Sequence, residues 1–277
     1  MNFDPSDPAL SAELPHDISE ALAWSAAERG PFGSPLFYAT EVTSTNDVAA
    51  RLAEAGAAEG TTIVAETQTE GRGRHGRVWC SPAGAGLYVS TIIRPDRQTV
   101  PGSGSALLTL MAGVALADAI REATGLVVDI KWPNDLVSEG RKLAGILAEG
   151  AGHGTSLEHV VLGFGINLRA ASYPPDVAAR ATSLETELGR PVDRGALLAR
   201  ALVNLSRVRT ASSERRTSEL INRWRELAPS AVGSVVEWPS SVGVRRGVTA
   251  GVDDEGALLV DVSGTTERIT AGEIVWL

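Results

Sequence analysis

A glycine-rich loop concentrates positive charge in an otherwise acidic sequence. The segment 71–77 reads GRGRHGR and holds Arg72, Arg74 and Arg77, whereas the whole chain of 277 residues has a net charge of −9. Glycine lets the backbone approach a ligand closely, and an arginine guanidinium can grip a phosphate with two hydrogen bonds. The segment therefore predicts a clamp for a small anion, with a solvated basic turn paired to surface carboxylates as the alternative. Because like charges so close together repel, we expect the loop to be loose until an anion arrives.

The same seven residues also match the dinucleotide-binding pattern G-x-G-x-x-G. That pattern requires a helix to begin at its third glycine. Here Gly76 is followed by Ser81-Pro82 and then by a strand expected over residues 86–94. This local context argues against a nicotinamide oxidoreductase.

Two further segments carry polar residues beside expected strands. In KWPNDL, Pro133 favours an extended Trp132 and so predicts a turn at Asn134 and Asp135, where a plain turn carboxylate is the alternative for Asp135. In RKLAGIL, Lys142 lies at the mouth of the next strand. Glycines in GFGIN interrupt a third strand, which often happens where a ligand comes near.

A mixed α/β domain must position these segments. Hydrophobic periodicity predicts strands at 36–42, 61–66, 86–94, 126–131, 142–149 and 158–168, and helices at 18–28, 48–58, 106–123, 193–210 and 214–227. Ser44 or Thr45 is expected to cap the second helix, and Gly125 to end the third. Short alternating segments after Val235 indicate a small β-barrel. We divide the chain into an N-terminal tail and short helix (1–35, with a mobile tail over the first eight residues), a catalytic domain (36–229) and a C-terminal domain (230–277).

Composition limits the classes of function. With 25 Lys and Arg against 34 Asp and Glu, the chain is not suited to bulk binding of nucleic acid or anionic membrane. The one cysteine, Cys80, leaves no internal disulfide and no cysteine-based metal cluster, which fits a reducing compartment. No apolar run reaches the roughly 18 residues of a membrane span, and the acidic, proline-rich start does not resemble a secretory signal. We expect a soluble, cytoplasmic protein.

Together these segments resemble the motifs of biotin protein ligases. The resemblance rests on Ser44-Thr45-Asn46, Gln68, GRGRHGR with Trp79 and Ser81-Pro82, KWPNDL, RKLAGIL and GFGIN, in this order within about residues 36–277. It implies an α/β (α+β) catalytic domain similar to class II aminoacyl-tRNA synthetases, with a mixed sheet and flanking helices, and a C-terminal SH3-like β-barrel. It also implies that biotin and ATP form biotinyl-5′-AMP, with Mg²⁺ on the phosphates and no protein cage for the metal. Biotin then passes to a lysine of a biotin carboxyl carrier protein domain of an acetyl-CoA or acyl-CoA carboxylase.

The resemblance also implies roles for individual residues. The catalytic set is Arg72, Arg74, Lys142 and Asp135, of which Asp135 orients the acceptor ammonium and helps to remove its proton. Biotin is expected to contact Ser44, Thr45, Asn46, Gln68, Arg72, Gly73, Arg74, Lys142, Gly145, Gly163 and Gly165, and the last three glycines form the floor under its chain. ATP or AMP is expected to contact Arg74, Arg77, Trp79, Lys131, Asn134 and Asn167. An ordinary core position is nearly as good an explanation of Trp79, and we assign no chemistry to His75 or Cys80.

Other activities remain as alternatives. The nearest is a lipoate or octanoate ligase of the same fold, although the hydroxyl and amide groups at Ser44, Thr45, Asn46 and Gln68 favour a urea over a dithiolane. Another is a non-catalytic biotin or nucleotide sensor, which Arg74, Asp135 and Lys142 together argue against. About 35 residues before the first strand are too few for a winged helix-turn-helix, so we expect a monofunctional ligase that does not bind DNA. A monomer or weak homodimer is expected.

Overall fold

A seven-stranded mixed sheet forms the centre of the computed structural model, which describes residues 10–11, 13–94, 104–153, 156–171, 173–210, 214–240 and 243–277. The mobile tail expected at the first eight residues lies outside these ranges. In spatial order the strands are β1 (Leu36–Val42), β2 (Thr62–Gln68), β3 (Gly86–Ile93), β7 (Ser156–Asn167), β6 (Arg141–His153), β5 (Asp135–Ser138) and β4 (Asp129–Lys131). The pair β1 and β2 is parallel and the other neighbours are antiparallel, which confirms the predicted mixed α/β class.

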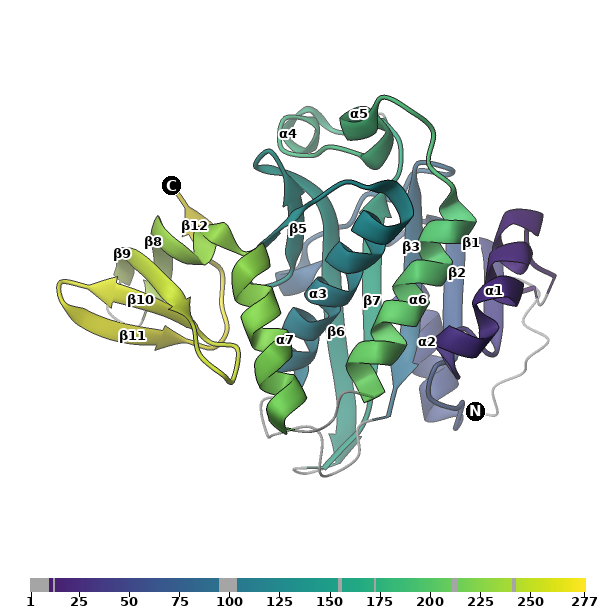
Figure 1. Cartoon of the computed structure of the whole chain (residues 1–277), viewed down its shortest axis with the longest axis horizontal. Helices are drawn as coiled ribbons and strands as arrows, with labels where there is room; N and C mark the ends of the chain where they lie inside the picture. The colour runs from purple at the N-terminus through teal and green to yellow at the C-terminus, as the bar shows by residue number, and fades with distance from the viewer. Residues whose placement is uncertain are drawn as a thin grey trace.

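Helices cover both faces of this sheet (Figure 1). The helices α1 (His16–Arg29), α3 (Gly104–Thr124), α6 (Arg194–Thr210) and α7 (Glu214–Leu227) lie in front of it in this view, and α2 (Thr45–Glu54) lies behind it. Two short helices, α4 (Pro175–Ala178) and α5 (Leu184–Leu188), cross one end. The larger apolar cluster includes Leu116 of α3 and Leu202 of α6, and a smaller cluster on the opposite face includes Leu52 of α2. Burial on both faces makes the sheet a rigid platform.

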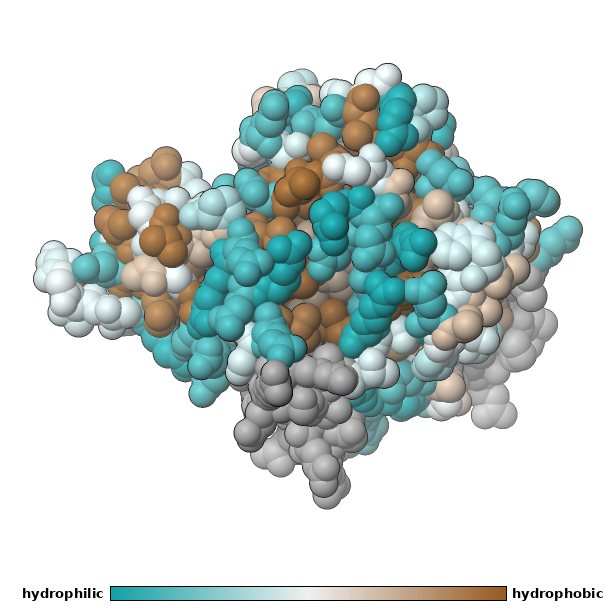
Figure 2. All heavy atoms as spheres, viewed as in Figure 1, coloured by the Kyte–Doolittle hydropathy of each residue, from teal (hydrophilic) through white to brown (hydrophobic). Residues whose placement is uncertain are grey.

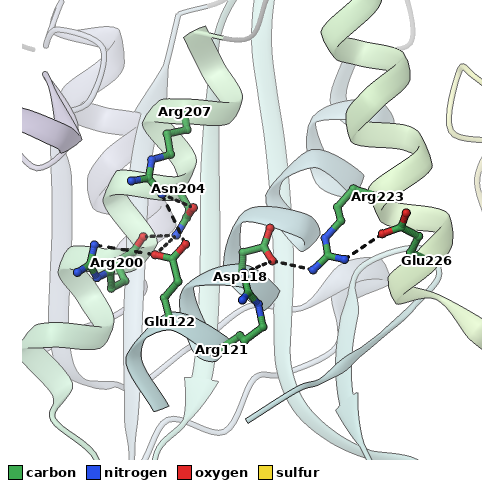
Figure 3. A network of polar contacts seen from close by, with 8 residues as sticks. All are labelled: Asp118, Arg121, Glu122, Arg200, Asn204, Arg207, Arg223 and Glu226. Atoms are coloured by element: carbon green, nitrogen blue, oxygen red, sulfur yellow. Dashed lines mark hydrogen bonds and ion pairs between the residues drawn. The ribbon is translucent and has the colours of Figure 1, made fainter. Parts of the chain in front are cut away.

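Charged side chains tie the outer helices together. Arg223 of α7 donates to Asp118 of α3 at 3.0 Å, and Asn204 of α6 donates to Glu122 of α3 at 3.2 Å (Figure 3). Hydrophilic residues cover the outer faces of these helices (Figure 2). Each of these contacts is partly exposed and therefore weak on its own. The apolar core sets the packing of the helices, and the polar contacts help to align them.

Some helices and strands begin or end at other residues than predicted, because local backbone hydrogen bonds and turns set their ends. The helix α2 begins earlier than expected, because Ser44 caps it by accepting from the backbone N–H of Asn46 at 3.3 Å, and it ends earlier at a turn through Gly56, whose φ is 92°. Gly125 ends α3 as predicted. The turn predicted at Asp135 is wrong for that residue, since Asp135 begins the short strand β5 and pairs with Gly145 of β6.

A second sheet follows the seven-stranded sheet and its helices. After a 3-10 turn, η2 (Pro229–Ala231), the strands β8 (Val232–Ser240), β9 (Gly243–Val252), β10 (Leu258–Val262), β11 (Thr265–Ile269) and β12 (Val275–Trp276) pair antiparallel in the order β11-β10-β9-β8-β12. It agrees with the predicted small β-domain. Trp132 fastens it to the larger layer, because the indole Nε1 donates to the carbonyl of Gly256 at 3.0 Å.

Candidate active site

A cavity of about 580 Å³ lies on the α2 side of the sheet. Its walls come from the start of α2, the end of β2, the arginine-rich loop, the turn after β4, and strands β6 and β7. Every site residue predicted from the sequence lines it, with the exception of Asn167. Segments up to about 230 residues apart in the sequence therefore meet in one hollow, in part because the sheet order places β6 and β7 beside β3.

The structure differs from the prediction at Asn167. This side chain is 4% exposed, and its amide donates to the carbonyl of Thr182 at 2.9 Å. The N–H of Thr182 in turn donates to the carbonyl of Lys142 at 2.9 Å. Asn167 thus holds Thr182, which in turn bonds to the backbone of Lys142, and it does not line the cavity.

One end of the cavity is polar and has fixed hydrogen-bond directions. The backbone N–H and the hydroxyl of Thr45 donate to Oε1 of Gln68 at 2.8 and 3.1 Å. The amide Nε2 of Gln68 then donates to Oγ of Ser81 at 2.8 Å. These contacts set which end of the Gln68 amide is donor and which is acceptor.

The amide of Asn46 is oriented in the same way. Its Oδ1 accepts from Ser90 at 2.5 Å and its Nδ2 donates to Glu149 at 2.7 Å. Asn46 fills the space in front of Gly163, where an added Cβ would lie 2.0 Å from Oδ1. Neither Ser90 nor Glu149 was among the predicted site residues. The period-two alternation of a strand starting from Gly145 places Glu149 on the cavity face, so the pattern contained a signal for it.

The glycines of β6 and β7 do not form the bare floor that we predicted. A Cβ at Gly165 would lie 2.5 Å from the Nε1 of Trp79, and one at Gly145 would lie 2.9 Å from the Cζ3 of the same ring. Trp79 therefore packs flat on these two strands, which only glycine permits at such an approach. It is half-buried, its Nε1 is buried with no hydrogen-bond partner among the described residues, and it lines the cavity, so it is not an ordinary core residue.

The opposite end of the cavity is cationic. The Nζ of Lys142 lies 2.7 Å from Oδ1 of Asp135 and 5.3 Å from the centre of the Trp79 ring. Burial lowers the pKa of Arg74 and of Lys131, and the nearby carboxylate of Asp135 opposes both shifts. Three cations thus surround one carboxylate, which leaves an excess of positive charge for an anionic ligand. Lys131 and Lys142 are the only two lysines in the sequence, and both line the cavity.

The arginine-rich loop is fastened by carboxylates of the chain itself. Arg72 pairs with Asp47 of α2 and, at 3.3 Å, with Glu149 of β6, and Arg77 pairs with Glu273. Within the described part of the chain, Arg74 is the one loop arginine that forms no ion pair. We expected the arginines to repel one another until an anion arrives, but the acidic partners already offset that repulsion. The three partners were not predicted, because their pairing depends on how distant elements pack.

The C-terminal segment completes the wall on the cationic side. Residues 272–276 line the cavity, and Lys131 lies with its Nζ 5.4 Å from the centre of the Trp276 ring. Together with the pair between Arg77 and Glu273, this makes the second sheet part of the site. The sequence indicated the sheet but not its place in the cavity.

No group of three or more His, Cys, Asp and Glu side chains within the described ranges is arranged to hold a metal ion. No helix among those same residues is long and apolar enough to cross a membrane.

Comparison with known proteins gives consistent matches. The model of the biotin/lipoate A/B protein ligase family matches residues 36–167. The biotin–[acetyl-CoA-carboxylase] ligase of Mycobacterium tuberculosis is 37% identical over 240 residues, which cover 84% of this chain and 86% of that protein. The bifunctional ligase/repressor BirA of Bacillus subtilis is 33% identical over 262 residues, covering 94% and 79%. The solved structure of biotin protein ligase from Aquifex aeolicus in complex with biotin and ATP matches with a TM-score of 0.75 at 29% identity, covering 87% of this chain and 98% of that one.

Proposed function

The chain belongs to the biotin/lipoate A/B protein ligase family, and we propose that it uses ATP to attach biotin to a lysine of a biotin carboxyl carrier domain. The observation that carries this assignment is the polarity of the cavity. One end holds oriented amides and hydroxyls, which match a neutral ureido ring, and the other holds Arg74, Lys131 and Lys142, which match a carboxylate and phosphates. A dithiolane ring has no N–H or C=O groups to pair with the polar end, which disfavours lipoate.

In the first half-reaction two anions must approach each other. An oxygen of the biotin carboxylate attacks the α-phosphorus of ATP, forming the acyl-phosphate bond of biotinyl-5′-AMP and breaking the bond to pyrophosphate. Lys142 and Arg74 offset the repulsion and stabilise the charge that develops on the phosphate oxygens. Mg²⁺ enters with ATP as part of that substrate.

In the second half-reaction an amine must lose a proton. The acceptor lysine loses its ammonium proton, and the lone pair of the neutral amine attacks the acyl carbon. The amide bond forms and the bond to AMP breaks, so that AMP leaves. We assign Asp135 to orient this ammonium and receive the proton, because it is the carboxylate that pairs with Lys142 at the cationic end. Its ion pair with Lys142 at 2.7 Å holds the carboxylate in place in the meantime.

Pyrophosphate exchange tests the assignment. Biotin is expected to stimulate exchange of labelled pyrophosphate into ATP, and biotin with ATP is expected to label a purified biotin carboxyl carrier domain on its lysine. Stimulation by lipoate or octanoate with none by biotin reverses the substrate assignment. Binding of biotin without any exchange identifies a sensor.

The C-terminal sheet is proposed to act within the catalytic site, with the domain boundary near residues 229 and 230. Glu273→Gln removes the partner that holds Arg77 in place beside the cavity. Because Arg77 is assigned to contact ATP, the KM for ATP is expected to rise about two- to fivefold, which is the usual contribution of a partly exposed ion pair. Glu267→Gln is the matched control, since it breaks a pair with Arg245 elsewhere on the same sheet. Equal effects of both variants on the KM contradict a role of Glu273 in the site.

A further inference from the structure

Glu187 is a buried carboxylate on the short helix α5. Its side chain is 6% exposed, and it accepts from side chains of two other segments. Its Oε2 accepts from the hydroxyl of Ser138 at 2.7 Å, and its Oε1 accepts from Nη2 of Arg141 at 2.7 Å and from the hydroxyl of Thr182. Burial disfavours the charged form, but the hydrogen bonds from Thr182 and Ser138 and the charge of Arg141 outweigh it and lower the pKa of Glu187. Because Glu187 does not itself line the cavity, these contacts serve the position of other residues.

Two of the three donors lie at the turn that precedes Lys142. Ser138 ends β5 and pairs with Arg141, the first residue of β6. Lys142 is the next residue of β6, and it pairs with Val137 of β5. Because both ends of this turn bond to the same carboxylate, Glu187 fixes the end of the β5–β6 hairpin from which the Lys142 side chain leaves the strand.

The third donor belongs to the segment on the other edge of β6. The N–H of Thr182 donates to the carbonyl of Lys142 at 2.9 Å, and the N–H of Lys142 donates to the carbonyl of Arg180 at 2.7 Å. A bridge between Lys142 and Ala181 continues the pairing of β6 past its last pair with β7. The same carboxylate therefore bonds to both backbone segments that flank Lys142.

We propose that Glu187 is a positioning residue for Lys142, because it joins the β5–β6 hairpin to residues 180–182 and so fixes the backbone from which Lys142 reaches into the cavity. The consequence for adenylation rests on the proposed function, whereas the placement of the side chain does not. A shift of Lys142 is costly to the reaction, because a donor to developing charge acts only from the correct position.

Lysine-selective ¹³C labelling observes this placement, because Lys131 and Lys142 are the only two lysines in the sequence. Each Nζ lies over a tryptophan ring, that of Lys142 at 5.3 Å from the centre of Trp79 and that of Lys131 at 5.4 Å from the centre of Trp276. Ring currents therefore shift the Hε signals of both lysines. In Glu187→Met, which removes the acceptor for all three donors, the Lys142 signal is expected to lose most of this shift while the Lys131 signal stays in place. An unchanged Lys142 signal overturns the proposal, and so do equal changes of both signals.

Three further variants separate the role of Glu187 from the stability of α5. Glu185→Met is the matched control on the same helix, because this carboxylate accepts from the N–H of Val192 at 3.2 Å, and both lysine signals should stay unchanged. Glu187→Gln keeps one acceptor oxygen, and its amide can donate to the hydroxyl of Ser138, so most of the wild-type signal should return. Ser138→Ala removes a single donor and should move the Lys142 signal in the same direction by a smaller amount. If Glu187→Met does not fold, an unchanged signal in Ser138→Ala overturns the proposal.

The rate of adenylation supplies the second readout. Glu187→Met is expected to lower the kcat of biotin-dependent pyrophosphate exchange about 10-fold and to leave the KM for biotin within about twofold. In the Lys142→Met background the same change should have no further effect, because Glu187 acts through that lysine. Additive losses in this cycle overturn the proposal. A protein without biotin-dependent exchange, but whose Lys142 signal responds as expected, contradicts the proposed function and leaves the placement by Glu187 intact.

Discussion

Lys142→Met is expected to lower the rate of biotin adenylation about 100- to 1000-fold, the usual effect of removing one preorganised donor to a developing negative charge. The Nζ of Lys142 is held 2.7 Å from Asp135 and stands over the Trp79 ring, so its position is fixed before substrates arrive. Methionine keeps the length and the apolar stem, and it removes the charge alone. Biotin-dependent pyrophosphate exchange measures this step without the carrier protein.

Two further variants separate the charge of Lys142 from its placement. Lys142→Arg keeps the charge, but the larger guanidinium must fit where the lysine Cε already lies 3.2 Å from a Cβ position at Gly145, so we expect only partial recovery. Asp135→Asn retains the Lys142 side chain, and it should slow transfer to the carrier more than it slows exchange. Exchange within threefold of the wild-type rate in Lys142→Met contradicts the assignment of Lys142 to the adenylation step.

Local chemistry explains which parts of the fold the sequence could predict. Ser44 and Gly125 delimit helices through capping and positive φ, which depend only on near neighbours. The glycines of β7 likewise indicated a close approach within the sheet. β5 escaped prediction because four residues carry too little periodicity, and its pairing with β6 decides that Asp135 lies in a strand.

Tertiary register explains what the sequence could not reveal about the site. Gly145 pairs directly with Gly165, and only this alignment makes a space wide enough for the ring of Trp79. The sequence predicted a close contact at these glycines and assigned that contact to the ligand. In the structure the side chain of Trp79 makes the contact. In the same way, the charge of Arg72 was evident, whereas its partners on α2 and β6 are separated from it by 25 and 77 residues in the chain. Electrostatic partners of this kind follow from packing.

Gly163→Ala is expected to weaken biotin binding about 10- to 100-fold. The added methyl would lie 2.0 Å from Oδ1 of Asn46, far inside van der Waals contact. Asn46 cannot simply turn away, because Ser90 and Glu149 hold both ends of its amide. Overpacking of this kind costs about 1–3 kcal/mol, and every 1.4 kcal/mol is about tenfold in affinity. Isothermal titration with biotin alone measures the effect without the chemical steps.

A control substitution on the neighbouring strand and a double variant identify the cause of the weaker biotin binding. Gly150→Ala on β6 is the matched control, because its methyl would meet the terminal Cδ1 of Leu157, which can move, and biotin affinity should stay within about twofold. In the Asn46→Ala background the clash at position 163 disappears, so Gly163→Ala should there cost little of either affinity or thermal stability. If Gly163→Ala costs as much without the Asn46 amide as with it, the loss arises from the strand itself and not from displacing the group that we assign to the ureido ring.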